Sequence, residues 1–229
     1  SDSGNMNFIS ALDGKAKKEI YLSHPFDMTA KFNSKEAYVA IDEEELYIVD
    51  LRDKNIIKEI VRDENLFIDG NILDYQGYLV FWKDTGDMTL IDTNTENTIS
   101  KELFADYVSE KVWYVDIYKN KLYYSKIGFN IYALSLDELN EVWNYDSGDS
   151  HTHSIPTILK DKIYLHTDEE ILVFEPSDGK ILKRYPISAT RIYSDNNNIY
   201  GIESDYIYKI NVAKEAIDWK YEANTKALI

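Results

Sequence analysis

The sequence contains no cysteine, few glycines and prolines, and far fewer basic than acidic side chains. The absence of cysteine excludes disulfides, thiolate metal sites and cysteine nucleophiles, and it is neutral on cellular compartment. With 9 glycines and 4 prolines among 229 residues, no Pro/Gly/Ser-rich linker divides the chain. No apolar run approaches the about 18 residues that a membrane-spanning helix needs. These absences favour one ordered domain without a membrane span.

The shortage of basic residues limits the classes of partner. Lys and Arg total 25 against 41 Asp and Glu, which gives a formal net charge of −16 at pH 7. Nucleic-acid binding depends on basic side chains that neutralise phosphates, so this balance argues against a nucleic-acid partner. It favours a basic protein partner, or it serves solubility alone.

A short unit recurs at a regular period along most of the chain. Ala133 to Trp143 reads as a short apolar strand, a polar turn and a second strand that reaches a large apolar residue. Similar eleven-residue units start at residues 11, 48, 90, 173 and 209, so that successive starts lie 36 to 43 residues apart. A period near 40 residues, built from strands, is typical of propeller blades or of a β-solenoid.

Two further strands precede most of these units. In the second repeat, residues 28–32 and 37–41 come before strands at 46–51 and 56–61, each separated by a polar turn. We therefore predict an all-β fold, a six-bladed β-propeller of four-stranded antiparallel blades. The first repeat supplies only two strands, so blade 1 is predicted to be a composite of N- and C-terminal strands. A strand near Asn224 to Ile229 would then protect its open edge.

The beginning of the sequence bears on location. Met6 opens a strand-like segment, and Ser1 to Asn5 before it resembles the remnant of an expression vector. On that interpretation the domain is 6–229, Met6 is the native start and the protein is cytoplasmic. The alternative is a mature exported protein trimmed of its signal, which would be periplasmic or surface-exposed.

The repeat resembles that of the PQQ-like, or quinoprotein, β-propellers, whose pattern is Ala-x-Asp-x-x-Thr-Gly-Lys-x-x-Trp. Trp143 and Trp219 match its last position, and Gly179-Lys180 match its Gly-Lys pair. The resemblance implies that the final aromatic packs between neighbouring blades and that the turn residues hydrogen-bond locally. The family's dehydrogenases usually carry a cysteine pair, which this chain lacks, so the resemblance implies a non-catalytic member without a quinone cofactor. Other members include an outer-membrane assembly lipoprotein.

Candidate chemistry is sparse. His151 and His153 are two apart and would point to one side of an extended segment, but two ligands do not make a metal site. With His24 they form either a pH-sensitive contact on one rim or parts of solvated loops. The sequence has no nucleophile elbow, Walker loop or dinucleotide fingerprint. We predict no enzymatic activity, no cofactor and no metal.

Acidic residues gather in particular turns. In a four-stranded blade, the turns between the second and third strands and the crossovers between blades lie on one rim. The acidic candidates for partner binding on this rim are Asp42, Glu43, Glu44, Glu45, Asp84, Asp87, Asp146, Asp149, Asp168, Glu169, Glu170 and Asp205. The plain explanation is that turns are charged because they contact water. The functional explanation is a negative face that steers and docks a basic protein.

The leading hypothesis is a non-catalytic, protein-binding propeller from a bacterium. Its most concrete form is an immunity protein that neutralises a cognate basic toxin through the acidic rim. One alternative is an exported or lipid-anchored scaffold of the bacterial envelope, which a signal peptide and lipid-anchoring Cys upstream in the gene would support. Another is a hydrolase or lyase that uses carboxylates at the channel, which converging acids in a deep pocket would support.

Overall fold

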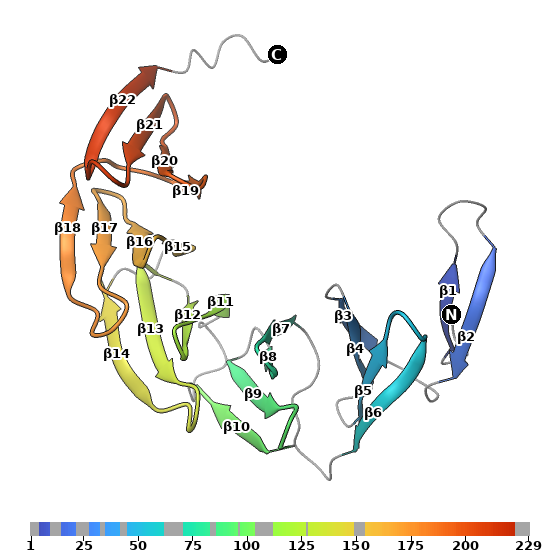
Figure 1. The fold of residues 1–229 in the computed structure, drawn as a ribbon. Coiled ribbons are helices and arrows are strands. Elements are labelled where there is room, and N and C mark those ends of the chain that lie inside the picture. The colour runs from blue at the N-terminus through green and yellow to red at the C-terminus, as the bar shows by residue number, and fades with distance from the viewer. Residues whose placement is uncertain are drawn as a thin grey trace. The chain divides into compact units, whose positions relative to one another are not determined.

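The computed structural model describes residues 5–9, 15–21, 28–32, 35–41, 45–61, 71–82, 86–95, 97–103, 112–126, 128–148 and 154–222. Every regular element in these ranges is a β-strand (Figure 1). The chain divides into two compact units, Ser1–Val108 and Ser109–Ile229, and each is described by itself. The prediction of a single domain over 6–229 stays a prediction.

The first unit contains a two-stranded and two four-stranded antiparallel sheets among its described residues. The two-stranded sheet pairs β1 (Asn5–Ile9) with β2 (Ala16–Tyr21). The next sheet has the order β3 (Met28–Phe32), β4 (Glu36–Ile41), β5 (Glu45–Asp50) and β6 (Asn55–Val61). The third consists of β7 (Asn71–Tyr75), β8 (Tyr78–Trp82), β9 (Asp87–Asp92) and β10 (Thr98–Glu102).

The second unit contains three four-stranded antiparallel sheets in its described ranges. They comprise β11 (Val112–Tyr118), β12 (Lys121–Lys126), β13 (Asn130–Ser135) and β14 (Glu141–Asp146); β15 (Thr157–Leu159), β16 (Lys162–His166), β17 (Ile171–Phe174) and β18 (Ile181–Tyr185); and β19 (Arg191–Ser194), β20 (Asn198–Ile202), β21 (Tyr206–Asn211) and β22 (Ala216–Glu222). The predictions of an all-β fold and of four-stranded antiparallel sheets are confirmed.

Within each unit, sheets that follow one another in sequence pack face to face. In the first unit, one cluster joins β1–β2 to the next sheet and contains Met6, Phe8, Ile20, Ala37, Val39, Tyr47, Val49 and Leu51. A second cluster joins that sheet to the third and contains Tyr38, Leu46, Ile48, Ile72, Leu79, Phe81 and Ile91. Because successive side chains of β4 and β5 enter different clusters, both faces of this sheet are covered. This explains why these strands are continuously apolar.

The second unit repeats this packing. The first two sheets meet through Tyr123, Ile131, Ala133, Trp143, Ile163, Leu165, Leu172 and Phe174. The last two meet through Tyr164, Ile171, Val173, Tyr185, Ile187, Ala189, Ile199, Ile210 and Val212. Each large apolar side chain buried in this way stabilises the fold by about 1.5–3 kcal/mol. The far face of the last sheet carries Tyr193, Trp219 and Tyr221, which are 51%, 42% and 60% exposed.

The eleven-residue unit of the sequence forms the same local structure in several sheets. At its first two positions the pairing register of the last two strands shifts, as a β-bulge, in four sheets: Ile48/Val49, Ala133/Leu134, Val173/Phe174 and Lys209/Ile210. At its third position a polar side chain accepts hydrogen bonds from the turn. Asp50 accepts from the backbone N–H groups of Arg52 and Asp53, and Asn211 accepts from that of Lys214.

The last position of the unit donates a hydrogen bond to the corresponding turn of the next sheet. Trp143 Nε1 donates to the Pro176 carbonyl at 3.1 Å. Lys58 Nζ donates in the same way to the Thr93 carbonyl at 2.5 Å. The contact expected of the consensus tryptophan is therefore present, and a lysine makes it where tryptophan is missing.

A search of the described residues for helices long and apolar enough to span a membrane found none.

Candidate functional site

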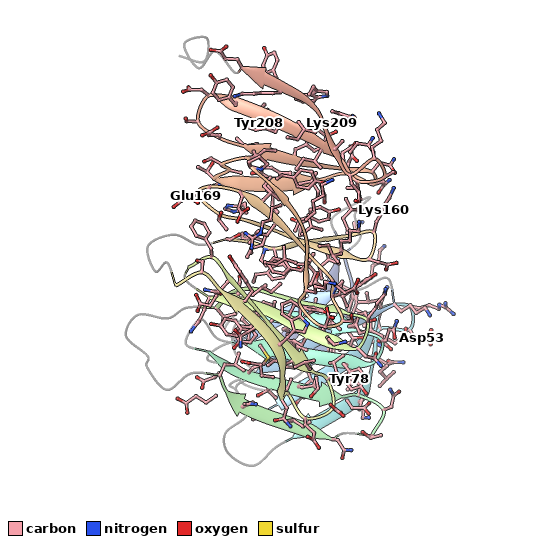
Figure 2. The ribbon with its side chains drawn as sticks, turned by 90° about the vertical axis from the view of Figure 1, so that its left-hand side faces the viewer. Asp53, Tyr78, Lys160, Glu169, Tyr208 and Lys209 are labelled. Carbon is pink, nitrogen blue, oxygen red and sulfur yellow. The ribbon has the colours of Figure 1, made fainter. Side chains whose placement is uncertain are left out.

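The predicted acidic residues that the structure describes lie mainly at one end of the sheets in the second unit. In each of these antiparallel sheets, the turn between the second and third strands lies at the same end as the end of the fourth strand. This end therefore includes the β16–β17 turn, the β20–β21 turn and the end of β14. Figure 2 shows Glu169, in the β16–β17 turn, at the opposite end of its sheet from Lys160 in the β15–β16 turn. We call Asp146, Asp168, Glu169 and Asp205 the acidic edge.

The β16–β17 turn holds two of these acids in a fixed loop. The hydroxyl of Thr167 accepts hydrogen bonds from the backbone N–H groups of Glu169 at 3.2 Å and Glu170 at 3.0 Å. It also donates to the Glu170 carbonyl, and the backbone N–H of Thr167 donates to the same oxygen at 2.8 Å. These bonds fix the turn locally, so the exposed side chains of Asp168 and Glu169 extend from a constrained backbone.

Asp205 and Asp146 complete the edge. Asp205 is exposed in a tight hairpin, which is closed by reciprocal backbone hydrogen bonds between Glu203 and Tyr206 of 2.9 and 3.3 Å. Asp146 ends β14 and accepts hydrogen bonds from the Tyr132 hydroxyl at 3.0 Å and the Gly148 N–H at 2.8 Å. Asp146 therefore supports its own turn in addition to carrying charge.

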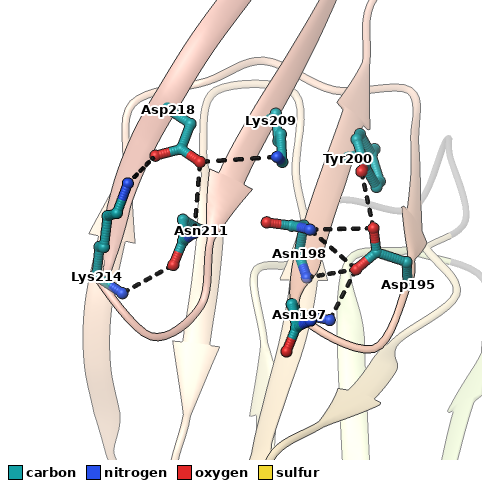
Figure 3. A network of polar contacts seen from close by, with 8 residues as sticks. All are labelled: Asp195, Asn197, Asn198, Tyr200, Lys209, Asn211, Lys214 and Asp218. Carbon is teal, nitrogen blue, oxygen red and sulfur yellow. Dashed lines mark hydrogen bonds and ion pairs between the residues drawn. The ribbon is translucent and has the colours of Figure 1, made fainter.

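Several acids at the opposite end of the same sheets are engaged within the protein. Figure 3 shows Asp195 accepting hydrogen bonds from Asn197, Asn198 and Tyr200, and Asp218 contacting Lys209, Asn211 and Lys214. The backbone N–H of Asn197, followed by Asn198 and Tyr200, holds the pKa of Asp195 well below its usual range. Lys162 likewise lowers the pKa of Glu215.

Most carboxylates of the acidic edge, by contrast, have no such partners in the part of the chain that the structure describes. Within the described residues, no hydrogen bond or ion pair engages the carboxylates of Asp168, Glu169 or Asp205. Their neighbour Glu170 is paired with Arg184. Nearby cations are also committed: the ammonium groups of Lys126 and Lys220 lie over the rings of Tyr132 and Tyr206, at 5.3 and 3.5 Å. Three exposed carboxylates therefore remain available to a partner.

The other predicted site residues fall into two groups. Asp87 is only 7% exposed, so it presents little surface to a partner, and Glu45 begins β5. The remaining residues lie outside the described ranges, namely Asp42, Glu43, Glu44, Asp84, Asp149, His24, His151 and His153. A search of the described residues for three or more side chains able to hold a metal ion together found no such group.

A cavity that sequence reasoning missed lies in the second unit. It has a volume of about 430 Å³ and is lined by Ile155, His166, Thr190, Arg191, Ile192 and Tyr193. Residues 190–193 read in the sequence as an ordinary short strand, and nothing in their spacing relates them to Ile155 or His166. Only the pairing of strands in space brings these residues together, so no sequence signal identifies the cavity.

Solved structures show which class of fold this is. BamB from Moraxella catarrhalis superposes with a TM-score of 0.61 at 13% identity, covering 97% of this chain and 71% of that chain. A KlHsv2 variant with one loop replaced by a Gly-Ser linker gives a TM-score of 0.57 at 12% identity, covering 96% of this chain and 79% of its own. Hsv2 from Kluyvelomyces marxianus gives 0.56 at 10%, with 96% and 80% covered.

These proteins are β-propellers, BamB of the PQQ-like and Hsv2 of the WD40-like kind, and the chain has a propeller-like fold. No protein-family model matches the sequence, and no curated protein matches it either. Identities of 10–13% show the fold alone. The predicted resemblance to β-propellers is confirmed, whereas assignment to the PQQ-like kind stays a prediction.

Proposed function

We propose that this propeller binds a basic protein through its acidic edge and performs no chemistry. The observation that carries the proposal is the difference between the two ends of the second unit. At one end Asp168, Glu169 and Asp205 are exposed and unengaged within the described residues. At the other end Asp195, Glu215 and Asp218 are held by partners within the protein. The net charge of −16 extends the attraction beyond the contact itself.

The geometry of the turns suits such a role. Charged side chains on constrained loops lose less backbone freedom on binding than side chains on mobile loops do, so less of the interaction energy is lost. Complementary charge mainly raises the association rate and selects the partner. A basic partner would thus be captured quickly and held by further contacts near the edge.

The most concrete form of the proposal is an immunity protein that covers the active site of a cognate basic toxin in the bacterial cytoplasm. An inhibitor of this kind needs fast capture and a rigid surface, and it needs no catalytic group. Cell fractionation of the native host checks the cytoplasmic location, since a periplasmic or surface-attached protein would contradict it.

The proposal includes a closed ring of six blades. The five four-stranded sheets and the β1–β2 pair of the described ranges would form these six blades. The remaining strand of the first blade would come from Asn224 to Ile229, which lie outside the described residues. A closed ring would leave no long unpaired edge, which protects a strand-rich protein from aggregation.

The experiment is capture of partners from a native-host lysate at rising salt, followed by binding kinetics with the purified partner. The test variant carries Asp168→Asn, Glu169→Gln and Asp205→Asn. The matched control carries Asp137→Asn, Glu138→Gln and Asp178→Asn, which remove the same charge from exposed turns at the opposite end. We expect the association rate at about 50 mM salt to fall roughly 10-fold in the test variant and less than 2-fold in the control.

Three results would overturn the proposal. One is a partner whose capture is insensitive to salt, and another is equal loss of binding in both triple variants. The third is an acidic partner. If the captured protein is toxic when expressed alone and co-expression of this chain restores growth, the immunity form is supported. A harmless partner would contradict that form.

A further inference from the structure

We propose that the cavity beside β19 is a binding site for a small organic monocarboxylate with an apolar body, and that Arg191 pairs with the carboxylate. This inference does not depend on the proposed function, because none of the residues that line the cavity belongs to the acidic edge. The cavity lies wholly within the second unit, and its about 430 Å³ fall in the range of small-molecule sites.

The cavity has a fixed inner wall. His166 is only 4% exposed, and its ring packs edge-on against Phe129 with 6.0 Å between the ring centroids. The Thr190 hydroxyl and backbone N–H both donate to the Ile202 carbonyl, at 3.0 and 2.8 Å. These contacts hold the polar part of the wall in place, so the cavity does not depend on a ligand for its shape.

The mouth is apolar. Ile155 and Tyr193 are each 51% exposed, although side chains of this kind are usually buried or scattered singly. Both line the same cavity, together with the half-buried Ile192. A ligand with an aromatic or branched body would cover these exposed surfaces and remove them from water.

Arg191 determines the charge of the ligand. It is the lining residue with a permanent charge, it is exposed, and no carboxylate among the described residues pairs with it. Arg184, by contrast, is committed to Glu170. A guanidinium beside an apolar cavity binds a carboxylate through charge-assisted hydrogen bonds, often two in parallel.

The surroundings favour a single negative charge over two. Asp168 and Glu169 follow His166 by two and three residues and are exposed in the turn that ends β16. Their charges repel a doubly charged group such as a phosphate monoester, and one arginine neutralises one charge. A monocarboxylate therefore fits the site better than a phosphate does.

The test is an NMR titration of the full chain with 3-phenylpropionate. The controls are 3-phenylpropanol, which keeps the body and lacks the charge, and phenyl phosphate, which carries more charge. We expect saturable shifts of the amides of His166, Arg191, Ile192 and Tyr193 with a Kd of about 1 mM, as suits a ligand of this size. The alcohol and the phosphate should bind about 10-fold more weakly or worse.

Two variants sharpen the test. Arg191→Gln should weaken the carboxylate about 10-fold and leave the alcohol unchanged, whereas Arg184→Gln makes the same charge change outside the lining and should have little effect. Ile155→Glu, at the half-exposed mouth, should also weaken the carboxylate. Unperturbed amide spectra elsewhere show that each variant is folded.

Several outcomes would overturn the site. These are no saturable shifts with 3-phenylpropionate up to roughly 20 mM, well above the expected Kd, or binding that Arg191→Gln leaves unchanged. Equal affinity for the alcohol would remove the role of the charge. Tighter binding of phenyl phosphate would show that the class of ligand is wrong.

Discussion

Gly179 shows at the level of one residue why the repeat keeps a Gly-Lys pair. Its φ is +72°, and a Cβ added there would lie 2.5 Å from the indole of Trp143 on the preceding sheet. Gly148 has a similar φ of +76°, but a Cβ there would meet no atom of the described residues within 4 Å. The two glycines share a backbone conformation and differ in packing. Comparing them therefore separates the cost of left-handed backbone strain from the cost of displacing Trp143.

We expect Gly179→Ala to lower the free energy of unfolding by about 2–4 kcal/mol, from left-handed strain together with displacement of Trp143. Gly148→Ala should cost about 1 kcal/mol, from strain alone. Urea unfolding of the two variants measures the difference. Equal losses would show that the contact with Trp143 does not constrain the turn.

Asp195 gives a pH-dependent prediction. Its pKa is lowered in the folded protein by donors from Asn197, Asn198 and Tyr200. The stabilisation is therefore present above the unfolded pKa of about 4 and is lost as the pH falls toward the lower folded value. Asp195→Ala should lower the Tm by about 2–4 °C at pH 7, and this difference should shrink progressively below about pH 4.

The measurement is thermal unfolding followed by circular dichroism between pH 7 and pH 2. Asp137→Ala is the control, because its carboxylate accepts no hydrogen bond from the described residues. A Tm difference for Asp195→Ala that stays constant down to pH 2 would contradict the assigned contacts.

At the level of the element, the sequence predicts the strands well and the site poorly. Alternation and turn residues place strands at 28–32 and 56–61, and the structure has β3 over Met28–Phe32 and β6 over Asn55–Val61. Strand formation depends on local pattern, which a sequence displays directly. The availability of Asp168 and the pairing of Glu170 with Arg184 depend on cross-strand neighbours, which spacing alone does not give.

The hydrogen bonds that join two neighbouring sheets can be tested at the Pro176 carbonyl. Pro176 accepts hydrogen bonds from Tyr123 at 2.9 Å and Trp143 at 3.1 Å. Either Tyr123→Phe or Trp143→Phe leaves the carbonyl with one donor. Tyr123→Phe should cost about 1–2 kcal/mol, and Trp143→Phe about 2–4 kcal/mol, because the latter also removes part of a buried ring that stacks on Phe174. The double variant leaves it buried without a donor, and its cost should exceed the sum by about 1 kcal/mol. Urea unfolding of the four proteins completes the cycle, and strict additivity would contradict the shared acceptor.

At the level of the whole molecule, the repeat predicts the fold, which composition does not. Composition gives an acidic, cysteine-free chain, whereas the period near 40 residues gives the sheets and their propeller-like fold. The period does not give the number of blades. That number depends on how the last sheet ends and not on any one repeat. Trp219 is the residue that reports on it, since it occupies in the last repeat the position that Trp143 occupies in an earlier one.

Ring closure can therefore be measured at Trp219. Its side chain is 42% exposed on the far face of the last sheet, whereas Trp143, which contacts the next sheet, is 8% exposed. In protein labelled with 5-fluorotryptophan, the fluorine shift between H₂O and D₂O reports how far each indole contacts water. If the proposed six-bladed ring closes, the solvent shift of Trp219 should approach that of Trp143, because burying its apolar surface is favourable. Removing Asn224 to Ile229 should raise the solvent shift of Trp219 again, and a solvent shift of Trp219 well above that of Trp143 in the intact chain would show that the ring is open.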